Sequence, residues 1–237
     1  MKYSEIYNIC MPEKKRKEER FNLWVTIAVR PLSIILTKPF IGTKVLPTTI
    51  TKWSILSVII GFFIICFSRD LIYNIIGWLF FFTWAVLDGV DGNYARCSKQ
   101  CSPIGDLWDT TGGYAAMILI YMSAGIASYY QTEFIDIGYD NIILILGCTT
   151  ATISIFPRLV MHKRKSSNFQ DDIVKDLSDK QGFSISKIIA MNLVSPSGFM
   201  QIIFLAALIL NLLNIFVICY FIVNTGIMLK SLSQLLR

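Results

Sequence analysis

The stretch Asp88–Gly113, DGVDGNYARCSKQCSPIGDLWDTTGG, holds four aspartates, one arginine and one lysine between two apolar segments. Ionisable side chains at the edge of the hydrocarbon layer are costly, so they mark a candidate functional site by default. The flanking segments, residues 71–88 and 106–129, come close to the length of about 20 residues that a membrane helix needs. We therefore expect a polar site where two membrane helices meet water.

The composition of the whole chain predicts a membrane protein. It has 237 residues, of which 54% are hydrophobic and 16% charged, against about a quarter charged in soluble domains. Because a lipid-exposed backbone must satisfy its own hydrogen bonds, we predict an all-α fold. The formal charge of +6 is explained by the basic cytoplasmic loops of a membrane protein, and no nucleic-acid partner is expected.

Six apolar runs lie at the spacing of a polytopic protein. We predict spans at 52–68, 71–88, 106–129, 141–160, 198–213 and 215–230. Lys and Arg gather before the first span, after the second and fourth, and at the C-terminus, whereas loop 130–140 has neither and only Arg69 opposes the pattern. By the positive-inside rule, we expect both termini and the acidic stretch to lie on the cytoplasmic side. We expect the membrane to be an inner or plasma membrane.

The chain before the first span has a different character. Residues 12–20, PEKKRKEER, form a charge run that suits either a solvated helix start or attraction to anionic lipid. Apolar residues then recur at helical spacing from Phe21 to Ile35, which indicates an amphipathic interfacial helix bent at Pro31. We divide the chain into an N-terminal cytoplasmic segment, 1–50, and a six-helix membrane domain, 51–237.

The first half of the acidic stretch has the residues of a metal-phosphate site. Asp88 and Asp91 are three residues apart and share a helix face with Gly92 and Ala95. Two converging carboxylates repel each other, and a divalent cation such as Mg²⁺, which also binds substrate phosphates, relieves that repulsion. Arg96 adds a planar donor group suited to phosphate oxygens.

The second half adds another acidic edge. Asp106 and Asp109 are three apart, and Gly105 and Gly112 allow a helix or nucleotide to approach closely. Glycine packing and helix capping are the alternative explanations. Four aspartates at two membrane-bordering helix ends exceed what capping needs, so we favour a metal-phosphate site.

Other chemically capable residues give weaker signals. With one histidine in the chain, Cys97 and Cys101 lack partners for a zinc site. His162 lies in a basic flank and is interpreted as solvated. Arg158 follows Pro157 at the cytoplasmic end of the fourth span, where it suits either contact with lipid phosphates or phosphate binding in the site.

The spacing resembles a known signature. Asp88-x-x-Asp91-Gly92-x-x-Ala95-Arg96, eight residues, then Gly105-x-x-x-Asp109, is similar to the motif of the CDP-alcohol phosphotransferases (also called CDP-alcohol phosphatidyltransferases). The six spans, the interfacial helix and the entry LPTTIT to the first span also resemble that family. The resemblance implies an enzyme that transfers a phospho-alcohol from a CDP-alcohol to a hydroxyl acceptor and releases CMP. It also implies a homodimer embedded in the lipid membrane.

Roles follow from the resemblance position by position. It implies that Asp88, Asp91 and Asp109 bind Mg²⁺ or Mn²⁺. It places Gly92, Ala95 and Arg96 in the CDP pocket, and we add Gly105 to that pocket. The acceptor is a lipid or a polyol or sugar-like alcohol, as in phospholipid or related phosphodiester biosynthesis.

The chain departs from the family pattern at one position. The motif closes with an aspartate four residues after Asp109, the usual candidate for the catalytic base, and here that residue is Gly113. Three explanations stay open: Asp106 supplies the carboxylate beside Asp109; the acceptor or a loose transition state needs no such base; or the protein binds nucleotide and metal without turnover. A small transporter is a further alternative, disfavoured because the acids lie at a helix edge and not at midspan.

Overall fold

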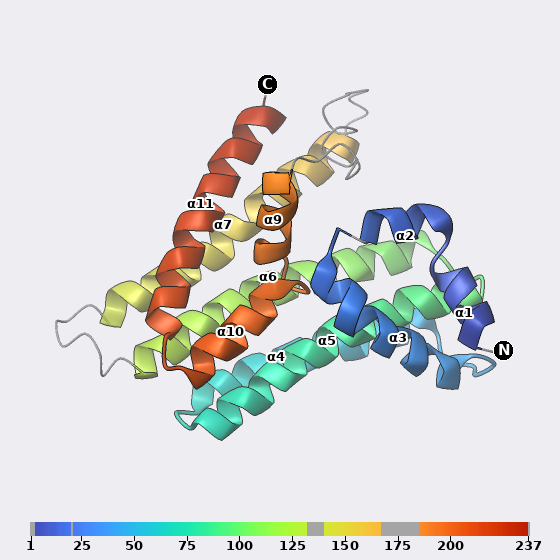
Figure 1. Cartoon of the computed structure of the whole chain (residues 1–237), viewed down its shortest axis with the longest axis horizontal. Helices are drawn as coiled ribbons and strands as arrows, with labels where there is room; N and C mark the ends of the chain where they lie inside the picture. The colour runs from blue at the N-terminus through green and yellow to red at the C-terminus, as the bar shows by residue number, and fades with distance from the viewer. Residues whose placement is uncertain (1–2, 20, 132–139, 167–184, 237) are drawn as a thin grey trace.

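The computed structural model describes residues 3–19, 21–131, 140–166 and 185–236, and this part of the chain contains helices and turns but no strand (Figure 1). The elements are α1 (Tyr3–Cys10), α2 (Glu13–Glu19), the π-helical turn η1 (Val25–Val29), α3 (Arg30–Thr37), the 3-10 turn η2 (Lys38–Phe40), α4 (Pro47–Phe67), α5 (Leu71–Cys97), α6 (Pro103–Gln131), α7 (Asp140–Ser166), α9 (Ile185–Val194), α10 (Phe199–Ile209) and α11 (Leu213–Leu235).

Five of these helices, α4, α5, α6, α7 and α11, are long and apolar enough to cross a membrane. A sixth crossing exists if the bent pair Ile188–Val194 and Phe199–Ile209 counts as one span. The all-α polytopic fold is thus confirmed. Several spans are longer than predicted: α5 runs through Asp88 and Asp91 to Cys97, so the first half of the acidic stretch is continuous helix.

The predicted fifth span, 198–213, differs from the structure. Its helix α10 covers only Phe199–Ile209, and α9 precedes it at an angle of 52°. The break falls at Ser195–Gly198, where Pro196 has no N–H group to continue the helix. The Gly198 N–H donates to the Ser195 carbonyl at 2.8 Å, and a Cβ on Gly198 would lie 2.7 Å from the Asn192 carbonyl oxygen. Only glycine fits that turn.

Two glycine pairs let the main helices pack closely. In the contact between α4 and α5, a Cβ on Gly61 would lie 2.7 Å from the Gly77 carbonyl oxygen. In the contact between α6 and α7, a Cβ on Gly147 would lie 2.6 Å from Gly125 Cα. Small residues at such contacts bring membrane helices together through backbone packing. The first pair holds α5 against α4 and the second holds α6 against α7, so each helix that carries part of the acidic stretch is packed against a neighbour.

Buried polar contacts attach the last helices to this framework. The Trp78 indole N–H donates to the Gln201 carbonyl at 2.8 Å, and the Gln201 side chain donates to the Phe81 carbonyl at 3.2 Å, joining α10 to α5. Asn224 of α11 donates to the Tyr121 hydroxyl of α6 at 3.2 Å. These bonds satisfy polar groups that the apolar interior would otherwise leave unpaired.

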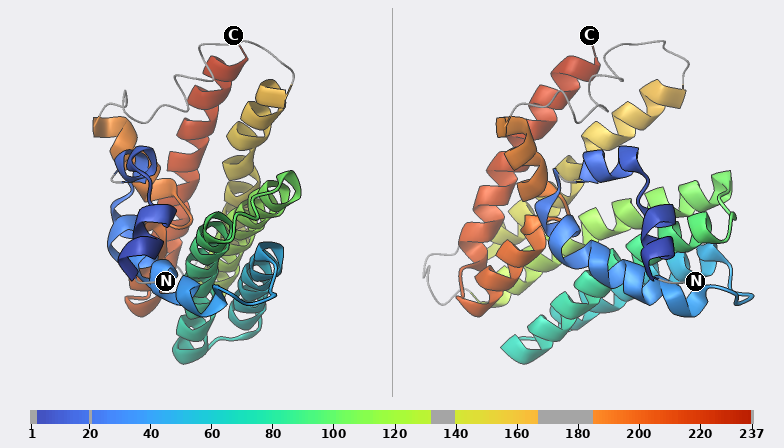
Figure 2. Two further views of the ribbon diagram at one scale, coloured as in Figure 1. Left: turned by 90° about the vertical axis from the view of Figure 1, so that its right-hand side faces the viewer. Right: turned by 45° about the vertical axis from the view of Figure 1, so that its right-hand side comes forward.

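The N-terminal segment lies against the end of α5. The predicted irregularity near Pro31 appears as the π-helical turn η1 directly before α3, in which Pro31 occupies the first turn. A proline cannot donate to the preceding turn, so a local change of hydrogen-bond pattern there is expected. The views of Figure 2 place this segment, the α5–α6 turn and the C-terminal end of α11 toward one side of the bundle, opposite the α4–α5 turn.

Candidate active site

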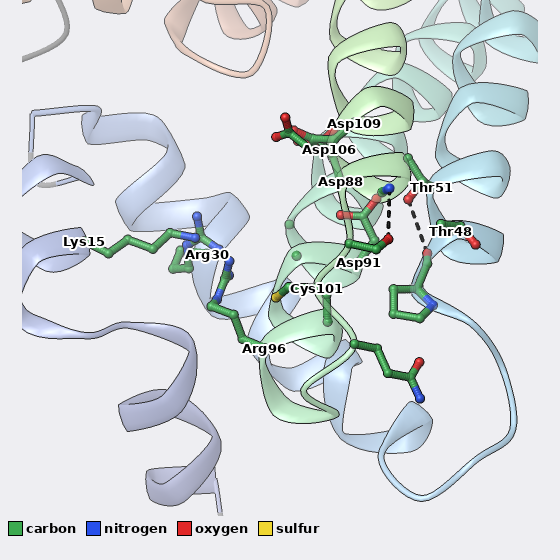
Figure 3. A pocket seen from close by; sticks show the side chains of 17 residues that line it. Lys15, Arg30, Thr48, Thr51, Asp88, Asp91, Arg96, Cys101, Asp106 and Asp109 are labelled. Atoms are coloured by element: carbon green, nitrogen blue, oxygen red, sulfur yellow. Dashed lines mark hydrogen bonds between the residues drawn. The ribbon is translucent and has the colours of Figure 1, made fainter. Parts of the chain in front are cut away.

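A cavity of about 400 Å³ opens at the ends of α4, α5 and α6, beneath α2 and α3. Each residue singled out from the motif lines it, namely Asp88, Asp91, Gly92, Ala95, Arg96, Gly105, Asp106 and Asp109. Figure 3 shows the four aspartates gathered on one side, with basic side chains on the other. The fold thus brings both halves of the acidic stretch to one place.

The last turns of α5 form the floor of this cavity. Asp91 is 4% exposed, and its Oδ2 atom is buried without a hydrogen-bond partner. An unpaired buried carboxylate oxygen is costly in a protein interior. A cation bound in the cavity would satisfy it. Gly92 lies beside it, and the three atoms nearest to a Cβ built there belong to the Arg96 guanidinium, the closest at 3.4 Å.

A tight turn carries the chain from α5 to α6. Lys99 adopts the left-handed conformation with φ 57°, and the Gln100 N–H donates to the Ala95 carbonyl at 2.9 Å, which closes α5. The Ser102 hydroxyl then accepts from the Gly105 N–H at 3.1 Å and caps α6. Asp106 follows in the first turn of α6, where the helix dipole favours a carboxylate. Helix capping thus explains why Ser102 stands at this position, and the helix dipole partly explains Asp106. Neither effect explains Asp109.

The carboxylates fit a divalent cation in chemistry. Asp88 interacts with both Asp109 and Asp91, and carboxylates that repel at short range are relieved by a cation that prefers oxygen ligands. Among the described residues, no three Asp, Glu, His or Cys side chains already form a complete metal-binding group. Mg²⁺ is usually held by one or two carboxylates together with water and substrate oxygens, so a site of this kind does not need three protein carboxylates in place.

The opposite wall is basic, and two of its residues, Lys15 and Arg30, were not predicted to belong to the site. Lys15 of α2 and Arg30 of α3 line the cavity together with Arg96. Arg30 donates from Nε to Glu19 at 2.7 Å and also pairs with that carboxylate through Nη2. Lys15 Nζ lies 3.5 Å from Glu19. No sequence pattern indicated this wall, because its members meet only through the packing of the N-terminal segment on α5.

Asn93 organises the two arginines. Its side chain is fully buried, and its Oδ1 accepts from Arg30 Nη1 at 3.1 Å and from Arg96 Nη2 at 2.9 Å. Its Nδ2 donates to the Ser33 hydroxyl at 3.2 Å, which fixes the amide orientation. Both guanidinium groups share Asn93 Oδ1 as an acceptor, which holds them side by side. Because Asn93 is uncharged, it neutralises neither of them. Two adjacent guanidinium groups suit an anion with several oxygens, such as a phosphate.

Lys15 lies in a crowded positive environment. Burial, with the charges of Arg30 and Arg96, lowers its pKa from 10.5 to about 8, although Glu19 acts in the opposite direction. Desolvation and like charges both disfavour the ammonium form. An anion entering the cavity would reverse this effect.

Gly113 occupies a distinct setting on α6. A Cβ added there would meet only Arg158 Nη1 of α7, at 4.0 Å. Next to it, the Tyr114 hydroxyl lies 3.2 Å from His162 Nδ1. The position where the family motif has its last aspartate therefore faces the guanidinium of Arg158, a residue that is exposed overall.

Comparison with known proteins fits this geometry. The aspartates of α5 and α6 face a basic wall in a helical protein that has five or six candidate membrane spans among its described residues. The sequence profile of the CDP-alcohol phosphatidyltransferase family matches residues 44–229, so the chain belongs to that family. A comparison with curated proteins found no match. The family match begins after η2, which leaves α1, α2 and α3 outside it.

Proposed function

We propose that this protein is an active CDP-alcohol phosphotransferase that moves a phospho-alcohol group from a CDP-alcohol to a hydroxyl acceptor and releases CMP. The supporting observation is that the spaced aspartates, Gly92, Ala95, Arg96 and Gly105 line one cavity in a chain of this family. Family membership supports the reaction class. The donor, the acceptor and turnover itself are the proposal.

Asp88, Asp91 and Asp109 are the residues that would hold Mg²⁺ or Mn²⁺. The unpartnered Oδ2 of Asp91 and the mutual repulsion of the carboxylates support this assignment. When bound, the cation neutralises charge on the diphosphate and stabilises the departing CMP oxygen. Asp88 and Asp91 would bind the cation from α5, at the floor of the cavity. Asp109 would bind it from α6.

The protein residues then position the reacting groups. Arg96 would bind diphosphate oxygens through its guanidinium, which Asn93 holds in place. The acceptor oxygen attacks the phosphorus attached to the alcohol, and the bond from that phosphorus to the bridging oxygen breaks as CMP leaves. The acceptor proton passes to a carboxylate at the α6 edge, Asp109 or Asp106. This route uses no carboxylate at position 113.

A non-catalytic relative that binds nucleotide and metal is the second candidate, and Gly113 is the observation that favours it. General-base catalysis contributes typically about 10²- to 10⁴-fold. Losing one base therefore slows such an enzyme without necessarily abolishing turnover. We favour the active enzyme because Asp106 and Asp109 both line the cavity.

The membrane setting forms part of the proposal. The basic residues of the N-terminal segment and the connections after the second and fourth spans support a cytoplasmic site with both termini in the cytoplasm, in an inner or plasma membrane. A homodimer, a lipid or polyol-like acceptor and a place in phospholipid or related phosphodiester synthesis are expectations from the family.

The direct test is a screen of CDP-alcohol donors against lipid and polyol acceptors with purified protein, reading released CMP. An active enzyme releases CMP only with a matched donor and acceptor and only with divalent metal. Metal-dependent CDP binding without CMP release from any pair would favour the non-catalytic relative.

A further inference from the structure

We propose that the N-terminal segment, residues 3–19 and 21–40, forms one wall of the donor site and that Lys15 binds a phosphate of the CDP-alcohol. This inference rests on the proposed function and extends it to a part of the chain that the family match does not cover. Among the described residues of that segment, Lys15 and Arg30 are the cations that line the cavity.

The segment is anchored well enough to carry a binding residue. Ile6, Cys10, Met11 and Ile34 form a small apolar core of their own, packed against Cys97 at the end of α5. Cys10 Sγ lies 3.6 Å from Cys97 Sγ, one residue after Arg96. Because this cluster joins α1 and α3 to the end of α5, the position of α2 is tied to the cavity floor.

A second set of contacts fixes the turn between α1 and α2. Arg16 donates from Nε to the Met11 carbonyl at 2.5 Å and from Nη2 to Asn8 at 2.8 Å, and its guanidinium lies 4.8 Å from the centre of the Tyr7 ring. Arg16 thus points back toward α1. Its neighbour Lys15 faces the cavity instead, with a side chain 26% exposed.

The charges around Lys15 leave a positive surplus. Lys15, Arg30 and Arg96 face the cavity, and Glu19 is the carboxylate that contacts both Lys15 and Arg30. Figure 3 shows these cations across the cavity from Asp88, Asp106 and Asp109. A diphosphate between them would meet metal-bound carboxylates on one side and the basic wall on the other. Lysine serves as a compact, mobile charge for such a phosphate.

Lipid attraction is the competing explanation for this basic segment. If lipid attraction were the role of the segment, replacing any of the neighbouring lysines of α2 would have a similar effect. The structure separates them: Lys17 is 53% exposed and pairs with Glu13 at 2.8 Å, away from the cavity, whereas Lys15 lines it. Lys17 is therefore a matched control on the same helix.

The experiment compares Lys15→Gln, Lys15→Arg and Lys17→Gln in the full-length protein in lipid nanodiscs. CDP with Mg²⁺ is the binding probe, and CMP release gives KM and kcat for the donor. We expect Lys15→Gln to weaken CDP binding and raise the donor KM by about 10- to 100-fold, the range for a hydrogen bond to a charged group. Lys15→Arg should retain most of the affinity, Lys17→Gln should match wild type, and kcat should change little.

The outcomes separate this inference from the function on which it rests. If wild type binds CDP and releases CMP while Lys15→Gln does so with unchanged affinity and KM, the inference is wrong and the proposed function stands. Equal losses in Lys15→Gln and Lys17→Gln would assign the segment to lipid attraction and also overturn it. Absence of CDP binding and CMP release in wild type would overturn both proposals.

Discussion

At the scale of single residues, the functional question centres on Gly113. A side chain fits there, because Arg158 Nη1, at 4.0 Å, is the one atom that a Cβ would meet. An aspartate introduced at this position would meet a guanidinium and form an ion pair. A carboxylate held in this way is a weaker base than a free one, because the nearby positive charge favours its ionised form.

Gly113→Asp is therefore expected to fold normally and to change the rate of CMP release by less than about tenfold. Combining it with Arg158→Gln frees the new carboxylate and should produce a larger change than Gly113→Asp alone. Initial rates of CMP release from the four proteins of this double-mutant cycle provide the measurement. A gain of more than about 100-fold from Gly113→Asp alone, within the range of general-base catalysis, would instead show that the chain has lost its base.

Lys15 gives a prediction for pH. Its pKa of about 8 lies below the usual value of 10.5 because of burial and the charges of Arg30 and Arg96. The protonated fraction in the free protein therefore falls as pH rises through about 8, and the positive charge available to a phosphate falls with it.

We expect the Kd of wild type for CDP with Mg²⁺ to rise between pH 7 and pH 9.5. The arginine of Lys15→Arg stays protonated throughout, so this variant should show a flatter profile. Binding isotherms at several pH values for both proteins test this. Identical profiles would show that Lys15 does not carry the effect.

At the scale of elements, the close contact between α6 and α7 aligns Gly113 with Arg158. A Cβ on Gly147 would lie 2.6 Å from Gly125 Cα and 3.0 Å from Gly125 N, both backbone atoms that cannot rotate away. Overpacking of this kind typically costs about 1–3 kcal/mol. Gly226 of α11 offers a control, since nothing lies within 4 Å of a Cβ built there.

Gly147→Ala is accordingly expected to lower the midpoint of thermal unfolding by several degrees. Gly226→Ala should leave it unchanged or raise it, because alanine is the better helix former by about 1 kcal/mol. Thermal unfolding of both variants in the same detergent provides the comparison. Equal midpoints for Gly147→Ala and wild type would mean that the α6–α7 contact is looser than described.

The elements also show what the sequence could and could not predict. The motif residues were predictable because helical spacing alone places Asp88, Asp91 and Arg96 along one stretch of α5. Pro196 and Gly198 mark the break between α9 and α10 in the sequence, but the predicted span 198–213 does not include α9 as the first half of a bent span. Local sequence marks a turn, whereas the direction of the chain after it depends on tertiary packing.

At the scale of the whole molecule, the same limit explains the basic wall. Lys15 and Arg30 lie more than 50 residues before the motif in the sequence, and their charges match many other lysines and arginines near a membrane. What selects them is the packing of α1 and α3 against α5, through the cluster around Cys10 and the Asn93 hydrogen bonds. Single-sequence patterns do not encode such long-range contacts.

The central claim is that the aspartates of α5 and α6 form a metal-dependent phosphotransfer site. CMP release from a CDP-alcohol and its matched acceptor should be compared for wild type, Asp91→Asn and Asp70→Asn, with and without a chelator. Asp70 is the control because it caps the opposite end of α5, accepting from the Ile72 N–H at 2.7 Å, and asparagine caps helices equally well.

We predict that Asp91→Asn and chelation each reduce CMP release by about 100-fold or more. Each decade of rate corresponds to about 1.4 kcal/mol of transition-state stabilisation. Asp70→Asn should retain the wild-type rate. Unchanged CMP release by a folded Asp91→Asn protein, or release that survives chelation, would contradict the claim.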